Sequence, residues 1–304
     1  MTEQQQYERP GKPVTNDLAQ RRNAPGLWRL GGHLAVLTAT GSLCLATRGL
    51  WLFPAMLLHG VVLSFLFCPL HESIHRTAFR AGWLNRIVAD VVGFLMVLPP
   101  RWFTAFHLAH HRFTQDPARD PELASAKPTR IGRYLYVLSG FEYWSRAWTG
   151  LLVRAWGKAD DAFLDTRLRA RTVREARAYL GLYALAALIA VTFGPRPFLV
   201  LWIGPALLGQ PFLRAYLLAE HWGCPAVKDM WANTRTTLSL APVRWLAWNM
   251  PFHAEHHANP GIPFHALPTF AKAEAHRRRV VASGYTAFHT ERLEALRAGT
   301  AEPV

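Results

Sequence analysis

Residues 50–75 read LWLFPAMLLHGVVLSFLFCPLHESIH, an apolar run that ends directly at a pair of histidines. As an α-helix the apolar part, 50–70, would measure about 31 Å, against about 30 Å for the hydrocarbon core of a membrane. His71 and His75 follow at the spacing HxxxH, which places both imidazoles on one helical face. The stretch therefore predicts a membrane span whose polar end bears two candidate metal ligands.

Three further apolar runs, 27–47, 178–193 and 198–219, are interpreted as spans, and short turns pair the four into two hairpins. The run 87–98 is too short to cross and is closed by Pro99-Pro100, so we expect a re-entrant or interfacial segment. Residues 134–156 mix aromatic rings with arginines, which is typical of a helix lying in the interface. The predicted fold class is an all-α membrane protein with four transmembrane helices in two hairpins and a cytoplasmic helical cap that bears the histidines.

Composition divides the chain into three parts. Residues 1–26 are polar and predict a mobile cytoplasmic N-terminal arm without a cleavable signal peptide. Residues 27–270 form the predicted membrane-embedded domain. Residues 271–304 are expected to be a polar C-terminal tail.

The chain has a formal net charge of +14 together with a hydrophobic fraction of 51%. Clustered basic residues can indicate nucleic-acid binding. Here they are dense between Arg76 and Arg177 and sparse in the short turns, which is the positive-inside pattern of membrane proteins. We therefore expect membrane lipids as partners and no nucleic acid. A soluble helical enzyme is the alternative that composition leaves open.

Nine of the 14 histidines lie just outside the ends of the predicted spans. After His71 and His75 come two HxxHH motifs and a single histidine that follows the fourth span. In HxxHH the positions i, i+3 and i+4 share one helical face, so three imidazoles can converge on a metal. The remaining members of the set are His107, His110, His111, His221, His253, His256 and His257.

The number of histidines limits the kind of metal site. A zinc site uses three or four protein ligands, so nine imidazoles exceed one zinc ion. Two ions with four or five nitrogens each would use them all, and imidazole suits iron. One such motif alone is a moderate signal, because a lone histidine is more often a hydrogen-bonded structural residue. His33 and His59, inside the first hairpin, are interpreted as structural in this sense.

The arrangement HxxxH, HxxHH, single His, HxxHH resembles the integral-membrane fatty acid desaturase and hydroxylase superfamily. The resemblance extends over about residues 50–268 and includes the contexts HESIHRTAF, FHLAHHRFTQDP and NMPFHAEHH. It implies that the nine histidines are ligands of two Fe²⁺ ions, with O2 as co-substrate. It also implies a lipid or acyl-chain substrate and a separate electron donor, a ferredoxin-type protein with its reductase, since no cytochrome or rubredoxin domain is fused to the chain.

Several residues near the motifs are candidates for contacts behind the ligands. Asn249 lies four residues before His253, on the same helical face, and is a candidate for such a contact or for one mediated by water; an N-cap or packing role is equally open. Asp116, Asp120 and Glu255 are candidates to orient imidazole N–H groups, and a role as solvated loop charges or helix caps is equally open. For Asp120 a solvated or capping role is favoured. His265 is a further candidate, and the polar stretch 233–237 is interpreted as a substrate gate, a docking segment or a plain turn.

These features predict an O2-dependent desaturase of a fatty-acyl chain. A di-iron hydroxylase or monooxygenase that acts on a lipid or hydrocarbon-like substrate is the close alternative, because both reactions use the same ligands. A metal transporter is a remote one, since transport residues are expected near the bilayer midplane and not at the ends of spans. The sequence does not identify the substrate, the position of oxidation, the electron donor or the oligomeric state.

Overall fold

The computed structural model describes residues 15–302 and is mostly helical. The first half of the described chain contains α1 (Thr15–Leu18), α2 (Asn23–Ala46), η1 (Gly49–Trp51), α3 (Leu52–Ser64), α4 (Phe67–Ile74), α5 (Gly82–Met96), α6 (Pro100–Phe113), η2 (Pro121–Ala124), α7 (Ile131–Leu138) and α8 (Phe141–Ala155). The second half contains α9 (Thr166–Phe193), α10 (Arg196–Phe198), η3 (Leu199–Ile203), α11 (Gly204–His221), α12 (Met230–Asn233), β1 (Thr236–Thr237), α13 (Ala241–Leu246), α14 (His253–Ala258), α15 (Leu267–Ala273), η4 (Ala275–Arg277), β2 (Val281–Ala282) and α16 (Tyr285–Ala298).

Three helical stretches of the described chain are long and apolar enough to cross a membrane: Gly49–Ile74, Thr166–Phe193 and Arg196–His221. A fourth span is possible if α5 and α6, bent by 97° at Val97–Pro99, count as one broken span or re-entrant loop. The run expected at 27–47 forms α2, but this helix contains Arg29 and His33 and is not among the three. The all-helical class and three or four candidate spans agree with the prediction, while the two hairpins and the cytoplasmic cap remain predictions.

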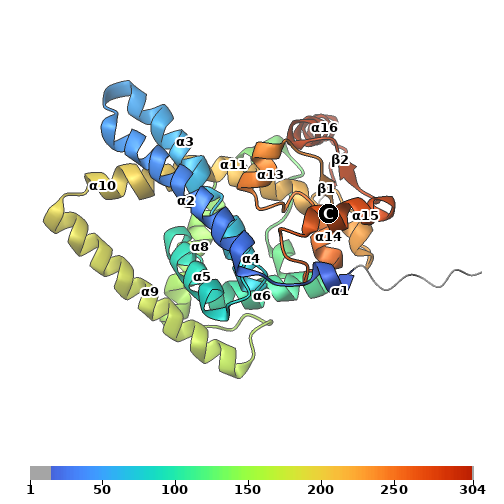
Figure 1. Cartoon of the computed structure of the whole chain (residues 1–304), viewed down its shortest axis with the longest axis horizontal. Coiled ribbons are helices and arrows are strands. Elements are labelled where there is room, and N and C mark those ends of the chain that lie inside the picture. Colours follow the sequence, from blue (N-terminus) through green and yellow to red (C-terminus); the bar gives the residue numbers. More distant parts are fainter. Residues whose placement is uncertain (1–14, 303–304) are drawn as a thin grey trace, which may run out of the picture.

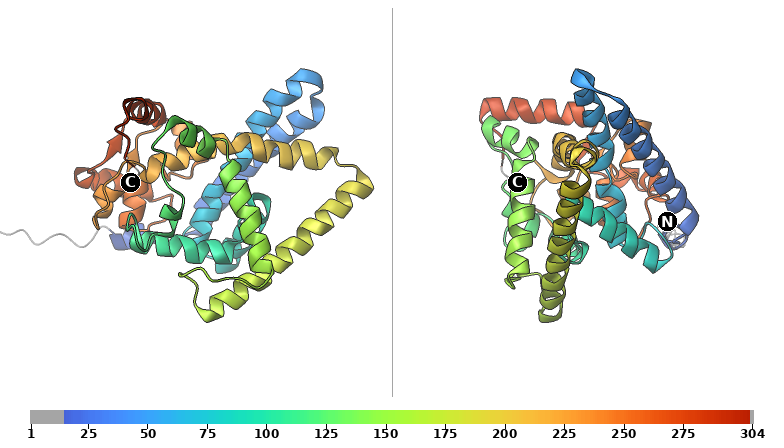
Figure 2. Two further views of the ribbon diagram at one scale, coloured as in Figure 1. Left: turned by 180° about the vertical axis from the view of Figure 1, so that it is seen from behind. Right: turned by 90° about the vertical axis from the view of Figure 1, so that its left-hand side faces the viewer.

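In Figure 1, α2 with α3 and the corner formed by α9 and α10 extend to one side, and the C-terminal helices gather at the other. α2 and α3 lie side by side as a hairpin, and α3 also packs along α11. α9 and α11 meet at α10 and diverge from it (Figure 2). Leu185, Leu188, Val191 and Phe193 of α9 are all more than half exposed, the surface expected of a helix that faces lipid.

Two glycines allow the backbones of α3 and α11 to touch. A Cβ added at Gly209 would lie 1.9 Å from the carbonyl oxygen of Gly60, and one added at Gly60 would lie 2.2 Å from the carbonyl oxygen of Pro205. Small residues at a helix crossing permit this close approach in membrane proteins. The contact fixes the direction of α11, whose last residue is His221.

The C-terminal residues are folded against the rest of the chain, whereas the sequence predicted a polar tail. β1 and β2 form a short parallel pair, and Phe288 of α16 is buried against Trp222. The apolar residues of α16 are few, so its hydrophobic pattern was too weak to predict this docking. At the other end, α2 begins at Asn23, inside the arm predicted at 1–26, while residues 1–14 of that arm lie outside the described part of the chain.

The interfacial helix predicted at 134–156 is divided into α7 and α8 by Gly140, which has a φ of +73°. A Cβ at this position would lie 2.6 Å from the side chain of Gln210 in α11. Glycine is therefore required both by the left-handed backbone and by the close packing. The break allows both short helices to contact the helices around the histidines.

Candidate metal centre

The nine predicted histidines are brought together in one interior region. Eight of them are buried and His75 is partly buried. They come from four parts of the chain: His71 in α4 with His75 directly after it, His107, His110 and His111 in α6, His221 at the end of α11, and His253, His256 and His257 in α14.

The helix that bears the first HxxHH motif is fixed at its start. Pro100 occupies the first turn of α6, where a missing N–H is tolerated. Both carboxylate oxygens of Glu175, in α9, accept hydrogen bonds from the backbone N–H of Arg101 at 3.1 Å, and one also accepts from that of Trp102 at 3.3 Å. A buried carboxylate therefore caps α6 and fixes the direction in which its histidines point.

The helix that bears the second HxxHH motif begins after a left-handed turn. Trp248 and Asn249 have φ values of +51° and +61°, and α14 begins only at His253. The prediction that Asn249 shares a helical face with His253 is therefore wrong. The side-chain amide of Asn249 instead donates to the carbonyl oxygen of Phe264 at 2.9 Å. Asparagine tolerates the left-handed region better than most residues, and here it ties the entry of α14 to the loop that follows.

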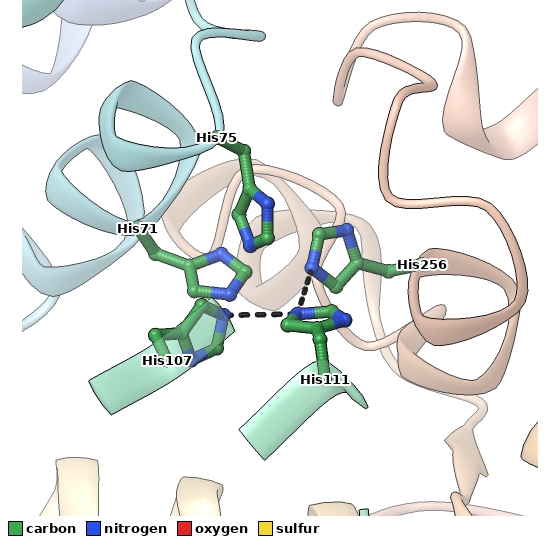
Figure 3. A group of neighbouring side chains, drawn as sticks. All are labelled: His71, His75, His107, His111 and His256. Atoms are coloured by element: carbon green, nitrogen blue, oxygen red, sulfur yellow. Dashed lines mark hydrogen bonds between the residues drawn. The ribbon is translucent and has the colours of Figure 1, made fainter. Parts of the chain in front are cut away.

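Five of the histidines form a first group, namely His71, His75, His107, His111 and His256 (Figure 3). Each offers one nitrogen, and these nitrogens all lie within 4.8 Å of one another. Nε2 of His111 is 3.0 Å from Nε2 of His107 and 3.2 Å from Nε2 of His256. In Figure 3 the five rings surround a common centre.

A second group consists of His110, His221 and His257. Nδ1 of His110 faces the carboxylate of Asp120 at 2.9 Å, and Nδ1 of His221 faces the carbonyl oxygen of Asn233 at 3.3 Å. Neither an ionised carboxylate nor a carbonyl can donate, so both Nδ1 atoms bear the proton. When both rings are neutral, as metal binding requires, their Nε2 atoms, 3.2 Å apart, present lone pairs to each other.

The same reasoning applies to His257. The hydroxyl of Thr114 donates its single proton to the carbonyl oxygen of His110 at 2.7 Å, so it accepts from Nδ1 of His257 at 3.1 Å. Nε2 of His257 is buried without a hydrogen-bond partner among residues 15–302. Its lone pair is therefore free, like those of His110 and His221.

The ninth histidine, His253, lies beside the second group. Its Nε2 is 3.2 Å from Nε2 of His221, and its Nδ1 is 3.5 Å from a carboxylate oxygen of Glu220. Burial, followed by the neighbouring imidazole of His221, holds the pKa of His253 well below its usual range. A neutral imidazole keeps the lone pair that a metal requires.

Two buried imidazole nitrogens whose lone pairs face each other repel one another, because no hydrogen-bond donor lies between them. A cation between them removes this repulsion. With ligand–metal distances of about 2.1 Å, two ligand atoms on one ion lie about 3.0–4.2 Å apart, which includes the Nε2–Nε2 distances above. Burial, together with His71 and His75, also holds the pKa of His256 well below its usual range, so His256, like His253, is poised as a neutral ligand. The two groups thus fit two metal ions.

The carboxylate that orients an imidazole is Asp120, for which the sequence favoured a capping or solvated role. Asp120 is buried, contacts His110 and also accepts from the backbone N–H groups of Gln115 and Glu122. The candidate Asp116 pairs with Arg119 at the surface instead. Glu255 turns away from the imidazoles toward Thr236 and Arg278.

The remaining candidates have other positions. His265 is half-buried against Phe264, and its Nε2 has no partner among the described residues. The polar stretch 233–237 is buried and partly forms β1, and Asn233 supports His221, so its polar groups are used inside the protein. His33 donates through Nε2 to the carbonyl oxygen of Val62, away from the groups.

Sequence reasoning missed, besides Glu220, three acidic or hydroxyl residues around the site, of which Glu72 and Thr114 are buried and Glu122 is 30% exposed. Glu72, within the HxxxH motif, accepts from the backbone N–H of Phe264 and so joins the first motif to the loop after the third. Thr114 supports His257, as described above. Glu122 places Oε2 3.5 Å from Nε2 of His110. The sequence signal that could have indicated Thr114 and Glu122 is their position soon after the first HxxHH motif.

A cavity of about 720 Å³ reaches His71, His107, His110 and His253. Most of the side chains around its metal-facing part are aromatic or aliphatic, including Phe67, Leu98, Trp102, Phe103 and Phe106. A cavity whose apolar side chains adjoin the histidines is suited to an alkyl chain.

Comparison with known proteins gives a consistent result. A family model described as fatty acid desaturase matches residues 15–290. A sphingolipid delta(4)-desaturase, DES1, of Drosophila melanogaster is 28% identical over 72% of this chain, and the chain spans only 64% of that relative's length. A human sphingolipid delta(4)-desaturase/C4-monooxygenase, DES2, is 28% identical over 75% of this chain and 68% of its own. An sn-1 oleoyl-lipid 12-desaturase of Picosynechococcus is 23% identical over 77% of this chain and 72% of its own.

Proposed function

The chain belongs to the fatty acid desaturase family, and we propose that it is an O2-dependent lipid desaturase whose nine histidines hold two iron ions. The observation on which this proposal depends is the convergence of buried imidazole lone pairs in two groups. Zinc would use three or four of these ligands, whereas two iron ions would use them all. The family and the three or four apolar helices together indicate a membrane protein and an oxidoreductase that acts on lipid.

When bound, the iron pair would bind O2 and supply an oxidant for an unactivated C–H bond. Desaturation removes one hydrogen from each of two neighbouring carbons; with two electrons and two protons from outside, O2 becomes two waters. The apolar cavity would hold the alkyl chain against His71, His107, His110 and His253 and exclude water from it. Asp120, Asn233 and Thr114 would keep three of the rings in the metal-binding tautomer.

Hydroxylation is the second candidate, because one relative is named as both a desaturase and a monooxygenase. That reaction inserts one oxygen atom of O2 into the C–H bond and reduces the other to water with the same two electrons. Mass spectrometry of lipids from cells with and without the protein separates the outcomes, as loss of two hydrogens or gain of one oxygen. Iron content of the purified protein tests the centre itself.

The electron donor is proposed to be a separate acidic carrier, of the ferredoxin type. A second cavity, of about 810 Å³, is lined by five arginines and lies beside the first histidine motif. In the described part of the chain only one of the five forms an ion pair, that of Arg101 with Glu175. Charge complementarity would steer an acidic carrier to this face. We place the face in the cytoplasm, because basic residues gather on that side of membrane proteins. The five are Arg76, Arg86, Arg101, Arg171 and Arg174.

A histidine substitution separates this function from metal transport. His110→Ala is expected to abolish O2-dependent product formation and to lower the iron content. A variant that retained product formation but changed metal uptake would favour the transporter.

A further inference from the structure

We propose that Glu122 is a carboxylate ligand of the metal ion held by His110, His221 and His257, so that the two metal positions have different ligand chemistry. The inference rests on the metal centre proposed above. Glu122 lies in η2, on the loop that follows α6, and its Oε2 is 3.5 Å from Nε2 of His110. No other part of the proposed function uses this carboxylate.

The atom that Glu122 faces identifies its role. In the neutral ring that a metal requires, Nδ1 of His110 donates to Asp120, so the nitrogen 3.5 Å from Glu122 presents a lone pair. A carboxylate oxygen beside a lone pair repels it unless a cation lies between them. The 3.5 Å separation is within the about 3.0–4.2 Å expected for two ligand atoms on one ion.

A proton on His110 is the simpler cation, but it cannot satisfy the whole group. Nε2 of His221 lies 3.2 Å from the same nitrogen of His110, and Nε2 of His257 has no partner. A single proton would bridge two of these acceptors and leave the others opposed. One divalent ion would serve the three nitrogens, and its charge would attract the carboxylate of Glu122 that already contacts Nε2 of His110.

The backbone and an ion pair hold Glu122 in place for this role. Its N–H donates to Asp120, the residue that orients His110, and its other carboxylate oxygen pairs with the ammonium of Lys127. Both Glu122 and Lys127 line the cavity that reaches the histidines. One oxygen is thus occupied by Lys127 while the other faces the imidazole.

The consequence is an asymmetric centre. Each ligand atom of the first group is an imidazole nitrogen. The second group is His110, His221 and His257, and Glu122 adjoins it through its contact with His110. The second position would combine imidazoles with one anionic oxygen, a harder donor that favours a higher oxidation state of iron.

Iron retention and Mössbauer spectra of the purified, iron-loaded protein test this proposal. Glu122→Gln keeps the size of the side chain and removes its charge. A chelator should remove one of the two irons at least about 10-fold faster than from the unchanged protein. This is the lower end of the loss of metal affinity that follows when a residue that hydrogen-bonds to a ligand is replaced. One quadrupole doublet should change and the other should remain.

Two variants separate ligation from the ion pair. Lys127→Met breaks the pair but leaves the carboxylate, so both irons should be retained as in the unchanged protein. Glu142→Gln removes another carboxylate of the same cavity, one that pairs with Arg133 and faces no imidazole, and should also have no effect on iron. If Glu122→Gln does not accumulate as folded protein, Glu122→Asp is used instead. Its carboxylate is one methylene farther from the metal, so the chelator should remove one iron faster while the other is retained.

An unchanged chelation rate and spectrum in the Glu122 variant would overturn the proposal, and so would equal loosening by Lys127→Met. Failure of the proposed function is distinguishable. If the unchanged protein contains one ion or a metal other than iron, the di-iron assignment is wrong, while the retention of that metal in Glu122→Gln still tests this ligand.

Discussion

Nδ1 of His110 lies 2.9 Å from Oδ1 of Asp120, and the two side chains are only 2% and 1% exposed. Asp120 cannot rotate freely, because it also accepts from the backbone N–H groups of Gln115 and Glu122. The imidazole is therefore held in one orientation and one tautomer, with Nε2 directed to the other histidines.

Asp120→Asn is expected to weaken metal binding about 10- to 100-fold, because an amide can present either a donor or an acceptor to Nδ1. Metal titration of the stripped protein measures this. Asp116→Asn is the matched control, since Asp116 pairs with Arg119 at the surface and should leave the affinity unchanged. Equal effects of the two substitutions would contradict the orienting role of Asp120.

His33→Ala should lower stability without removing metal. His33 is fully buried, and its Nε2 is 2.9 Å from the carbonyl oxygen of Val62, a contact between α2 and α3. Loss of a buried hydrogen bond and of the packed ring costs about 1–3 kcal/mol or more. Thermal unfolding in detergent should show a lower midpoint, while the iron content of the folded protein stays the same. Loss of iron from folded protein would show that His33 supports the metal centre.

Gly209→Ala and Gly181→Ala should have effects of opposite sign. An added Cβ at Gly209 would lie 1.9 Å from the Gly60 carbonyl oxygen and must displace backbone, whereas at Gly181 it meets nothing within 4 Å. Overpacking of this kind costs about 1–3 kcal/mol or more, while alanine in an open helical position gains up to about 1 kcal/mol. Thermal unfolding midpoints of the two variants give the comparison. A tolerated Gly209→Ala would mean that α3 and α11 are less closely packed.

The attachment of α16 should weaken at acidic pH. Burial lowers the pKa of His289, although a contact with the carbonyl oxygen of Ala215 partly opposes this. The unfolded segment binds a proton near pH 6.5, as free histidine does, whereas the folded one resists it until a lower pH. Stability is thus fully present above about pH 6.5 and falls as the pH drops below it.

Hydrogen exchange of α16 at about pH 7.5 and about pH 5.5 measures this dependence, on either side of the histidine pKa. His289→Gln cannot titrate and should remove part of the difference between the two conditions. His276→Gln replaces an exposed histidine and should keep it. A pH dependence that is unaffected by His289→Gln would assign it to other groups.

Part of this molecule follows from local sequence. Apolar length indicated helices that can span a membrane, although α2 is less apolar than that interpretation required. The nine histidines were identified because helical periodicity places i, i+3 and i+4 on one face, a property that needs no knowledge of distant residues.

The sequence by itself determined which histidines belong together and that the chain is helical and apolar, because both depend on short-range spacing and composition. Only the tertiary structure decided that Asp120 and not Asp116 faces His110, that Asn249 forms a left-handed turn, and that Glu122 lies against an imidazole nitrogen. The physical reason is that the path of a loop is set by packing and hydrogen bonds to residues far along the chain. No periodicity in the sequence encodes that path.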